Sequence, residues 1–417
     1  MQSSEIEKIL LELYAKSDGA VANDEVYAQV EKVAGNAVVA PVGKSKQPRN
    51  LLHRKIRWAQ QNLKLDGSIT SIKRGHWRLT GKKDIELHSI DAANHMVAMS
   101  TSLGVAIWAK SNTIFDSDIF DDEIHCVITS PPYPLKTPRA YGNEIDTKAY
   151  IRFIVESLEP LVAKLCKGGN IVLNLSQDIF ETNSPARSDY LERLVITLKD
   201  ELGLFLMDRI PWVCTNKPPG PIQYASLKRM QLNNGWEPVY SFTNDPIANI
   251  SNNQRILEPH TQQHLDFVRN GGTKKHAVNG DGAYVKRVGS YAKETKGKIP
   301  RNVFFDSNIL LFPNNCVSGK AVSDYAKSLG IASHGAKMPL SLAEKLVQFF
   351  SREGDLVVDP FGGTLTTGHA AEKHKRRWIC TDMMWEYIRS SFIRFEDRVI
   401  NPKFLSSPWR NRKKSVS

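Results

Sequence analysis

The sequence predicts an α/β protein with a Rossmann-like, mostly parallel sheet covered by helices, preceded by a small helical domain. Between about residues 85 and 215, and again between 334 and 398, short apolar strands alternate with amphipathic helices. Such alternation is typical of parallel strands that are joined by crossover helices. Near the N-terminus, apolar residues recur at helical spacing instead, which indicates a separate helical module.

The composition is that of a globular protein with an anionic partner. The chain has 417 residues, of which 41% are hydrophobic and 24% are charged, and its formal net charge is +12. This length allows two or three domains, and this charge favours nucleic acid as the partner. The five cysteines are widely spaced and form no C-x-x-C pair, so neither a disulfide framework nor a metal site is expected. Without a signal peptide or a long apolar stretch, a cytoplasmic protein with no membrane contact is expected.

Residues 1–84 are predicted to form a winged-helix-like DNA-binding domain. Ile6, Leu10 and Tyr14 lie on one face of a first helix, and further helices are expected over 23–33 and 49–63. Two short β-type runs follow, over 68–72 and 76–80, with a turn between them. Three helices and a hairpin resemble a winged helix-turn-helix module.

The charges of this domain support contact with DNA. Between Arg49 and Lys83 the chain carries ten Lys or Arg residues and the single acid Asp66. They fall on the predicted recognition helix and on the hairpin, the two elements that would meet phosphates and a groove. The alternative is a solvated basic face on a dimerisation domain. The predicted contacts are Arg54, Arg57, Lys73 and Arg74.

The remaining chain is predicted to form one α/β domain with an insertion. A strand over 125–129 and a helix over 148–165 are followed by a turn at Gly168-Gly169 and a strand over 170–175. The predicted divisions are a first α/β half over 85–215, an insertion over 216–333, a second α/β half over 334–400 and a basic tail over 401–417.

The predicted insertion, 216–333, is irregular and basic. From Arg269 to Arg301 it has nine Lys or Arg residues and two acids. A long irregular insertion in a compact domain is usually functional or disordered, and this charge indicates contact with phosphates or bases. The predicted contacts are Lys274, Lys275, Lys286, Arg287 and Lys298.

A candidate catalytic loop, Ser130-Pro131-Pro132-Tyr133, ends the strand over 125–129. Two prolines stiffen the loop and leave its carbonyl oxygens as unopposed acceptors. Ser130 adds a hydroxyl group, and Tyr133 adds an aromatic face. Two acceptors that bind the hydrogens of a base amino group would direct the nitrogen lone pair at an electrophile, while the ring stacks on a base outside the duplex. The alternative is a proline-rich turn without chemistry.

A candidate ligand site follows a second strand. Asp359-Pro360-Phe361-Gly362-Gly363-Thr364 forms a glycine-bearing turn before a helix, and Asp382 ends the next strand 23 residues after Asp359. This spacing suits a carboxylate that binds ribose hydroxyls. The turn is neither G-x-G-x-x-G nor a phosphate-binding loop, so a nucleoside without phosphates, such as S-adenosylmethionine, fits better. The alternative is an ordinary turn in a structural sheet.

Together these two motifs resemble the β group of DNA amino-methyltransferases over roughly residues 105–398. In that family the catalytic loop precedes the target-recognition region and the cofactor motif. The resemblance therefore implies that 85–215 is the catalytic half, 216–333 the target-recognition region and 334–400 the cofactor-binding half. The resemblance implies a circularly permuted, seven-stranded Rossmann-like sheet, S-adenosylmethionine as methyl donor and double-stranded DNA as substrate. Residues 334–342, with His334 and Pro339, resemble the segment that wraps the methionine part of the donor. Trp212 lies in a segment that resembles the loop beside the flipped base.

Within this family, serine at the first position of the catalytic loop is typical of cytosine-N4 enzymes. Ser130, together with Tyr141-Gly142-Asn143, therefore implies methylation of cytosine N4 in a restriction–modification system, with a cognate endonuclease as a possible partner. Adenine-N6 methylation is the alternative within the fold, and a DNA-binding regulator with a vestigial methyltransferase domain is the alternative outside it. Cytosine-C5 chemistry is not expected, because no Pro-Cys dipeptide occurs to supply its nucleophile.

Overall fold

The structure is a computed structural model of the chain, and two compact units are apparent in it, Met1–Ile85 and Glu86–Ser417. Each unit is described by itself. The residues described are 3–17, 20–34, 39–41, 48–65, 68–79, 87–91, 94–116, 120–134, 146–181, 184–214, 220–280, 284–304 and 316–406. Tyr141-Gly142-Asn143 and most of the predicted basic tail lie outside these residues.

In the first unit, three helices pack on a small sheet. The helices are α1 (Ser3–Lys16), α2 (Asn23–Ala34) and α3 (Leu51–Leu65). The sheet has the order β1 (Val21–Ala22), β5 (His76–Leu79), β4 (Ile69–Lys73), and a second pair joins β2 (Val39–Pro41) to β3 (Pro48–Asn50). The predicted helices and hairpin are therefore present. β1 is an additional strand, and its two residues are too few for the sequence to predict it. The winged-helix assignment stays a prediction.

The core of this unit is apolar, and its basic side chains are outside. Ile6, Leu10, Ile56 and Trp77 pack together at its centre. Arg54 and Arg57 are exposed on α3, and Lys73 and Arg74 are exposed at the turn between β4 and β5.

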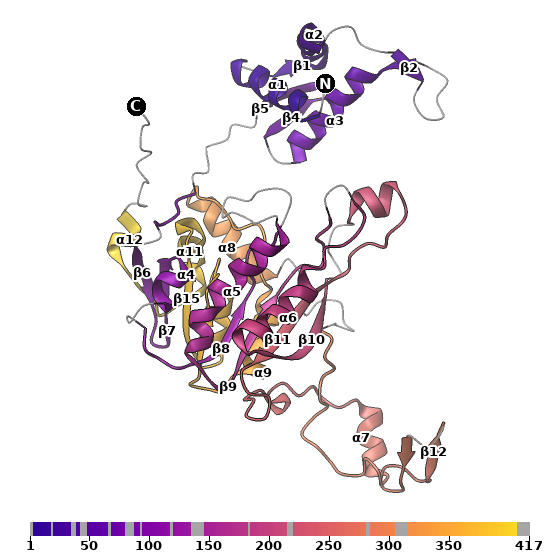
Figure 1. The fold of residues 1–417 in the computed structure, drawn as a ribbon, viewed down its shortest axis with the longest axis vertical. Coiled ribbons are helices and arrows are strands. Elements are labelled where there is room, and N and C mark those ends of the chain that lie inside the picture. Colours follow the sequence, from indigo (N-terminus) through magenta and orange to yellow (C-terminus); the bar gives the residue numbers. More distant parts are fainter. Residues whose placement is uncertain are drawn as a thin grey trace. The chain divides into compact units, whose positions relative to one another are not determined.

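The second unit is built on a nine-stranded sheet (Figure 1), whose order is β10-β11-β9-β8-β14-β15-β7-β6-β16. The pairs β9–β8, β8–β14, β14–β15 and β15–β7 are parallel, and the pairs at both ends of the sheet are antiparallel. The expected parallel sheet is thus its central part. The strands are β6 (His95–Ser100), β7 (Gly104–Ala109), β8 (Ile124–Thr129), β9 (Leu165–Asn174), β10 (Phe205–Val213), β11 (Trp236–Thr243), β14 (Leu356–Asp359), β15 (Arg377–Asp382) and β16 (Val399–Ile400).

Helices cover both faces of this sheet. Residues of α4, α5 and α6 form one apolar core with one face, and residues of α9, α10, α11 and α12 form a second core with the other face. Because both faces are covered, β14 is buried along its whole length. The helices of this unit are α4 (Ser111–Phe115), α5 (Thr147–Ala163), α6 (Tyr190–Leu202), α7 (Gln262–Arg269), α8 (Val317–Ser328), α9 (Leu340–Phe350), α10 (Thr366–Lys373), α11 (Trp385–Ser391) and α12 (Pro402–Ser406).

The turn predicted at Gly168-Gly169 is wrong, because β9 runs through both glycines. Gly168 has φ +76°, and the β8–β9 register shifts beside it, as in a β-bulge. A Cβ at Gly168 would lie 2.0 Å from the Ala248 carbonyl oxygen, so the close approach of the 245–249 loop requires glycine there. The difference arises because a glycine in a β-bulge has the same sequence signature as a glycine in a turn.

The predicted target-recognition region, 216–333, contains parts of the central fold. β11 lies inside the main sheet, and α8 packs against α11. Between them, a segment with α7 and the strands β12 (Ala277–Asn279) and β13 (Tyr284–Lys286) extends away from the sheet (Figure 1). At its base, Glu258 and Lys298 exchange two backbone hydrogen bonds of 2.9 and 2.8 Å.

Among the described residues, no helix is long and apolar enough to cross a bilayer. Within the same residues, no cluster of three or more His, Cys, Asp or Glu side chains could hold a metal ion.

Candidate active site

The two predicted motifs meet in one cavity of about 800 Å³ at the carboxyl ends of β8 and β14. These strands are parallel neighbours, with Cys126 opposite Val357 and Val127 opposite Val358. The loop after β8 and the turn after β14 therefore open on the same edge of the sheet, although they lie far apart in the chain. The predicted residues that line the cavity are Ser130, Pro131, Pro132, Tyr133, His334, Asp359, Pro360, Phe361, Gly362, Gly363, Thr364 and Asp382.

Asp359 joins the two motifs. Its Oδ1 accepts hydrogen bonds from Thr129 Oγ1 at 2.6 Å and from the Phe361 backbone N–H at 3.1 Å. Its Oδ2 accepts a hydrogen bond from Thr367 Oγ1 at 2.7 Å. Burial raises the pKa of Asp359 to about 6, although these three donors act in the opposite direction. The carboxylate predicted to bind a ligand thus uses its hydrogen bonds to hold the strand before the candidate catalytic loop against the glycine-bearing turn.

Asp382 holds the glycine turn from the neighbouring strand. Its Oδ2 accepts from the Gly363 backbone N–H and its Oδ1 from the Met384 backbone N–H, each at 2.8 Å. Burial raises the pKa of Asp382 to about 6, against the effect of these two donors. The carboxylate is enclosed by protein atoms yet keeps a face on the cavity, and each oxygen retains a lone pair for a ligand hydroxyl.

The turn itself has a strained leucine that a buried arginine supports. Leu365 is fully buried and has φ +53°, a left-handed conformation that costs a non-glycine residue roughly 1–2 kcal/mol. Arg394 donates from Nε to the Thr364 carbonyl oxygen at 2.8 Å and from Nη2 to Thr366 Oγ1 at 3.2 Å. Burial lowers the pKa of Arg394 to about 10. Arg394 is not among the predicted site residues, because it lies outside both motifs, at the end of the short helical turn Phe392–Arg394.

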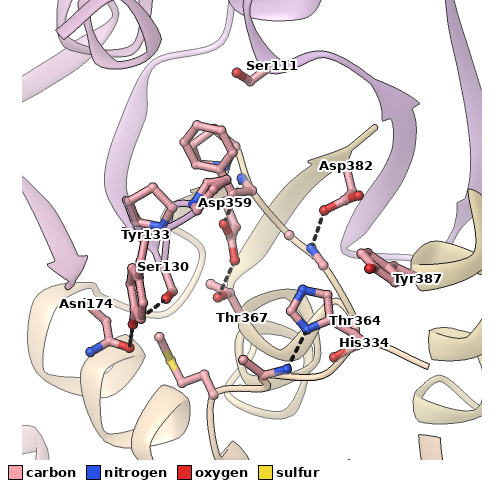
Figure 2. A pocket seen from close by; sticks show the side chains of 18 of the residues that line it. Ser111, Ser130, Tyr133, Asn174, His334, Asp359, Thr364, Thr367, Asp382 and Tyr387 are labelled. Atoms are coloured by element: carbon pink, nitrogen blue, oxygen red, sulfur yellow. Dashed lines mark hydrogen bonds between the residues drawn. The ribbon is translucent and has the colours of Figure 1, made fainter. Parts of the chain in front are cut away.

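On the far side of the turn, His334 forms a wall with Tyr387 (Figure 2). Their rings pack edge to face with centroids 4.5 Å apart, and the Ala336 backbone N–H donates to His334 Nδ1 at 3.2 Å. Lys337 also lines the cavity, and burial, helped by neighbouring Arg394, lowers its pKa. Pro339 precedes α9 and is not among the described residues that line the cavity.

At the other end of the cavity, the hydroxyl of Tyr133 is the centre of a polar cluster (Figure 2). Ser130 Oγ lies 3.1 Å from it, and the hydroxyl donates toward Asn174 Oδ1 at 3.2 Å and Glu237 Oε2 at 3.3 Å. Burial of the hydroxyl raises the pKa of Tyr133 well above its usual range, and the nearby Glu237 raises it further. The hydroxyl therefore stays protonated and holds the loop in place. Asn174 and Glu237 were not predicted as site residues.

The known proteins that resemble this chain are DNA methyltransferases. A DNA methylase family model matches residues 124–393. The chain belongs to the DNA methylase family. The type II methyltransferase M.PvuII of Proteus hauseri is 30% identical to it over 315 residues, which cover 74% of this chain and 88% of that protein. M.HpaI of Haemophilus parainfluenzae is 23% identical over 279 residues, 66% of this chain and 69% of that protein.

A solved structure supports the same fold. The structure named PvuII DNA methyltransferase (cytosine-N4-specific) superposes on this methylase with a TM-score of 0.55 and 26% identity, covering 73% of this chain and 91% of that chain. The predicted Rossmann-like methyltransferase fold is confirmed. S-adenosylmethionine is the methyl donor of this methylase, and DNA is its substrate. The family match begins at residue 124, so the unit Met1–Ile85 lies outside it.

The predicted DNA-contacting side chains of the extended segment differ in their surroundings. Lys275, Lys286 and Arg287 are exposed. Lys274 donates to the Asn270 carbonyl oxygen, within its own segment. Lys298 forms an ion pair of 3.0 Å with Glu258, which also binds Lys345 at 3.2 Å, so Lys298 closes the base of the segment.

Three of the four buried cysteines are poorly suited to nucleophilic attack. All five cysteines have free thiols, and burial raises the pKa of Cys126 and of Cys380 well above the usual range and that of Cys166 to about 11. A thiol with a raised pKa is a poor nucleophile at neutral pH, in agreement with the expected absence of cytosine-C5 chemistry.

Proposed function

We propose that this methylase transfers the methyl group to N4 of a cytosine that is flipped out of duplex DNA. The observation that carries the proposal is the Ser130 hydroxyl, which begins the catalytic loop and opens on the same cavity as the glycine turn. The cytosine-N4 specificity printed for the solved PvuII methyltransferase supports it. The cavity, about 800 Å³, lies within the usual range of roughly 300–1,000 Å³ for ligand pockets.

The residues of the donor end fit S-adenosylmethionine, a nucleoside that carries no phosphate. The Asp382 carboxylate would accept hydrogen bonds from the ribose hydroxyls. It would use the lone pairs that do not bind the backbone N–H groups of Gly363 and Met384. His334 and the cation of Lys337 would lie beside the methionine part, and Phe361 would offer an apolar face. When bound, the donor supplies an electrophilic methyl group on a sulfonium sulfur. Asp359 would act indirectly, by keeping the turn against the catalytic loop.

At the acceptor end, the loop would hold the amino group of the base. Ser130 Oγ and the Pro131 carbonyl oxygen would accept its two hydrogens, while the ring of Tyr133 offers a surface for stacking. Trp212, which is buried and lines the cavity, would form another wall of the base pocket. The exposed cations of the extended segment and of α3 would bind DNA phosphates, which adds affinity and position but no sequence information.

Product analysis decides between cytosine N4 and its alternative, adenine N6. Duplex plasmid DNA is incubated with the methylase and radiolabelled donor, digested, and separated into nucleosides. We expect the label in N4-methylcytosine, and label in N6-methyladenine would refute the base assignment. A complete absence of labelled DNA together with intact DNA binding would favour a regulator with a vestigial domain. Mapping the modified positions then gives the recognition sequence.

We also propose that the methylase works in the cytoplasm and protects the sites of a cognate restriction endonuclease. Its type II relatives and its free thiols support this setting. Plasmid DNA from cells that express the methylase should resist one endonuclease of matching specificity. Cleavage at every mapped site would contradict the pairing.

A further inference from the structure

Methylation of an amino group leaves a surplus proton on its nitrogen, and this proton must be removed. As the amino nitrogen of the base forms the new N–C bond, the donor's S–C bond breaks and its electron pair stays on sulfur. The nitrogen then carries a positive charge and one hydrogen too many. An acceptor that is in place as this charge develops lowers the barrier, typically by a factor of 10²–10⁴ in rate.

Five carboxylates line the cavity among the described residues, and they differ in which groups they contact. Asp359 is bound by Thr129, Thr367 and the Phe361 backbone, and Asp382 by the backbone of the donor side. Glu156 forms a 3.1 Å ion pair with Arg152, and Asp178 lies 3.6 Å from Arg187. The fifth is Glu237, and it reaches the catalytic loop.

The sheet topology explains how Glu237 comes to the site. β11 is antiparallel to β9, so its first residues lie at the edge where the parallel strands end. Glu237 is opposite Trp212 on β10, and facing residues of paired strands project to the same side of a sheet. Both side chains line the cavity.

The hydrogen-bond cluster around Tyr133 can hold one more proton. The hydroxyl has a single hydrogen, but it lies within hydrogen-bonding distance of two acceptor oxygens, Asn174 Oδ1 and Glu237 Oε2. The amide orientation is set by Asn174 Nδ2, which faces the Pro238 carbonyl oxygen at 3.5 Å. Two acceptors thus compete for one hydrogen. A proton on Glu237 would remove the competition, because Glu237 could then donate to Tyr133 while Tyr133 donates to Asn174.

We propose that Glu237 is the terminal proton acceptor of the methyl-transfer reaction and that Ser130 and Tyr133 relay the proton to it. The proton of the methylated amino group passes to Ser130 Oγ as the Ser130 hydroxyl proton passes to Tyr133. The Tyr133 proton passes in turn to Glu237, so each oxygen of the relay ends with the number of hydrogens it began with. The oxygen–oxygen distances are 3.1 Å and 3.3 Å, and such bonds usually shorten once the reactants are bound. The inference rests on the proposed amino-group chemistry but not on which base carries the amino group.

The first test compares Glu237→Gln with a matched control, Glu192→Gln. Glu192 lies on α6 and acts electrostatically on Tyr240, another tyrosine of the same sheet, but it does not line the cavity. Single-turnover methyl transfer should fall by about 10²-fold or more in Glu237→Gln and stay unchanged in the control. Donor affinity from calorimetry and duplex affinity from anisotropy should be unchanged in both. A wild-type transfer rate in Glu237→Gln, or a loss of donor affinity that accounts for the slower transfer, would overturn the proposal.

The second test separates proton acceptance from a merely structural role. In Glu237→Ala, added formate should restore transfer in proportion to its concentration, because a small carboxylate can occupy the vacated space. Tyr133→Phe, which lacks the middle of the relay, should be slow and should not respond to formate. Failure of formate to restore Glu237→Ala while it binds donor and duplex normally would also overturn the relay. The identity of the wild-type product tests the base assignment separately.

Discussion

Replacing Asp359 with asparagine should stabilise the protein at neutral pH. The folded state raises the pKa of this carboxyl to about 6 from a reference value of 3.8. The folded state therefore prefers the protonated form, and the stability linked to it is fully present below pH 3.8 and is lost as the pH rises through 6. At 1.36 kcal/mol per pH unit, the difference amounts to about 3 kcal/mol of unfolding free energy at pH 7.5.

Asparagine can preserve most of the geometry. Its carbonyl oxygen can still accept from Thr129 and from the Phe361 backbone N–H, and its amide group can donate to Thr367 Oγ1. The Thr367 hydroxyl, already 3.4 Å from the Ile128 carbonyl oxygen, can turn toward that oxygen. The variant therefore keeps a bonded network without the buried charge.

Urea unfolding of both proteins between pH 4.5 and 7.5, followed by near-ultraviolet circular dichroism, measures the effect. The stability of Asp359→Asn relative to wild type should rise by about 2 kcal/mol across this range, because about 1 kcal/mol of the full difference is already present at pH 4.5. Asp359→Ala is the control, because it leaves two buried threonine hydroxyls without their acceptor and should be destabilised at every pH. A relative stability of Asp359→Asn that does not change with pH would refute the reasoning.

Three further predictions concern binding. Donor affinity measured by calorimetry should weaken as the pH falls below about 6, because protonation of Asp382 removes the charged acceptor of ribose hydroxyls, and Asp382→Asn should bind more weakly without this pH dependence. Lys286→Ala should reduce the salt dependence of duplex binding by about one unit of log–log slope, whereas Lys298→Ala, whose ammonium is paired with Glu258, should change it less. Arg394→Ala should lower donor affinity and leave duplex affinity unchanged, because it removes the support of the Thr364 carbonyl oxygen; equal donor affinity would contradict that role.

The sequence could predict the two motifs because each is contiguous. Ser130 and Tyr133 lie on one loop after one strand, and Phe361 and Gly363 lie on one turn after another, so a strand–loop–helix pattern is enough to position them. The parallel strands and the covering helices follow from the same alternation, but the order of the strands does not. Their number did not follow either: the resemblance implied seven strands and the sheet has nine, including β16, which has only two residues and pairs with β6 at the edge.

Glu237 and Asn174 could not be predicted in the same way. Neither belongs to a motif, and each reaches Tyr133 from a different strand. Their proximity depends on the direction of β11, and a run of alternating residues does not reveal whether a strand is parallel or antiparallel to its neighbour. The run that begins with Trp236 and Glu237 has the pattern of a strand in the sequence. That pattern does not indicate at which edge of the sheet these two residues lie.

Asp359 lines the cavity and also joins two elements of the fold through its hydrogen bonds. An aspartate after an apolar strand and before a glycine turn fits a ligand contact, and it lines the cavity as expected. Its hydrogen bonds nevertheless go to Thr129 on β8 and Thr367 on α10. Under the proposed binding mode, the distance between the methyl donor and the base depends on this joint. One carboxylate binds Thr129, which directly precedes Ser130, and Phe361 in the turn that contains Gly363. The chain order of the two motifs is therefore immaterial to the chemistry, as a permuted family requires: what sets their spacing is the β8–β14 pairing and the buried carboxylate at its end.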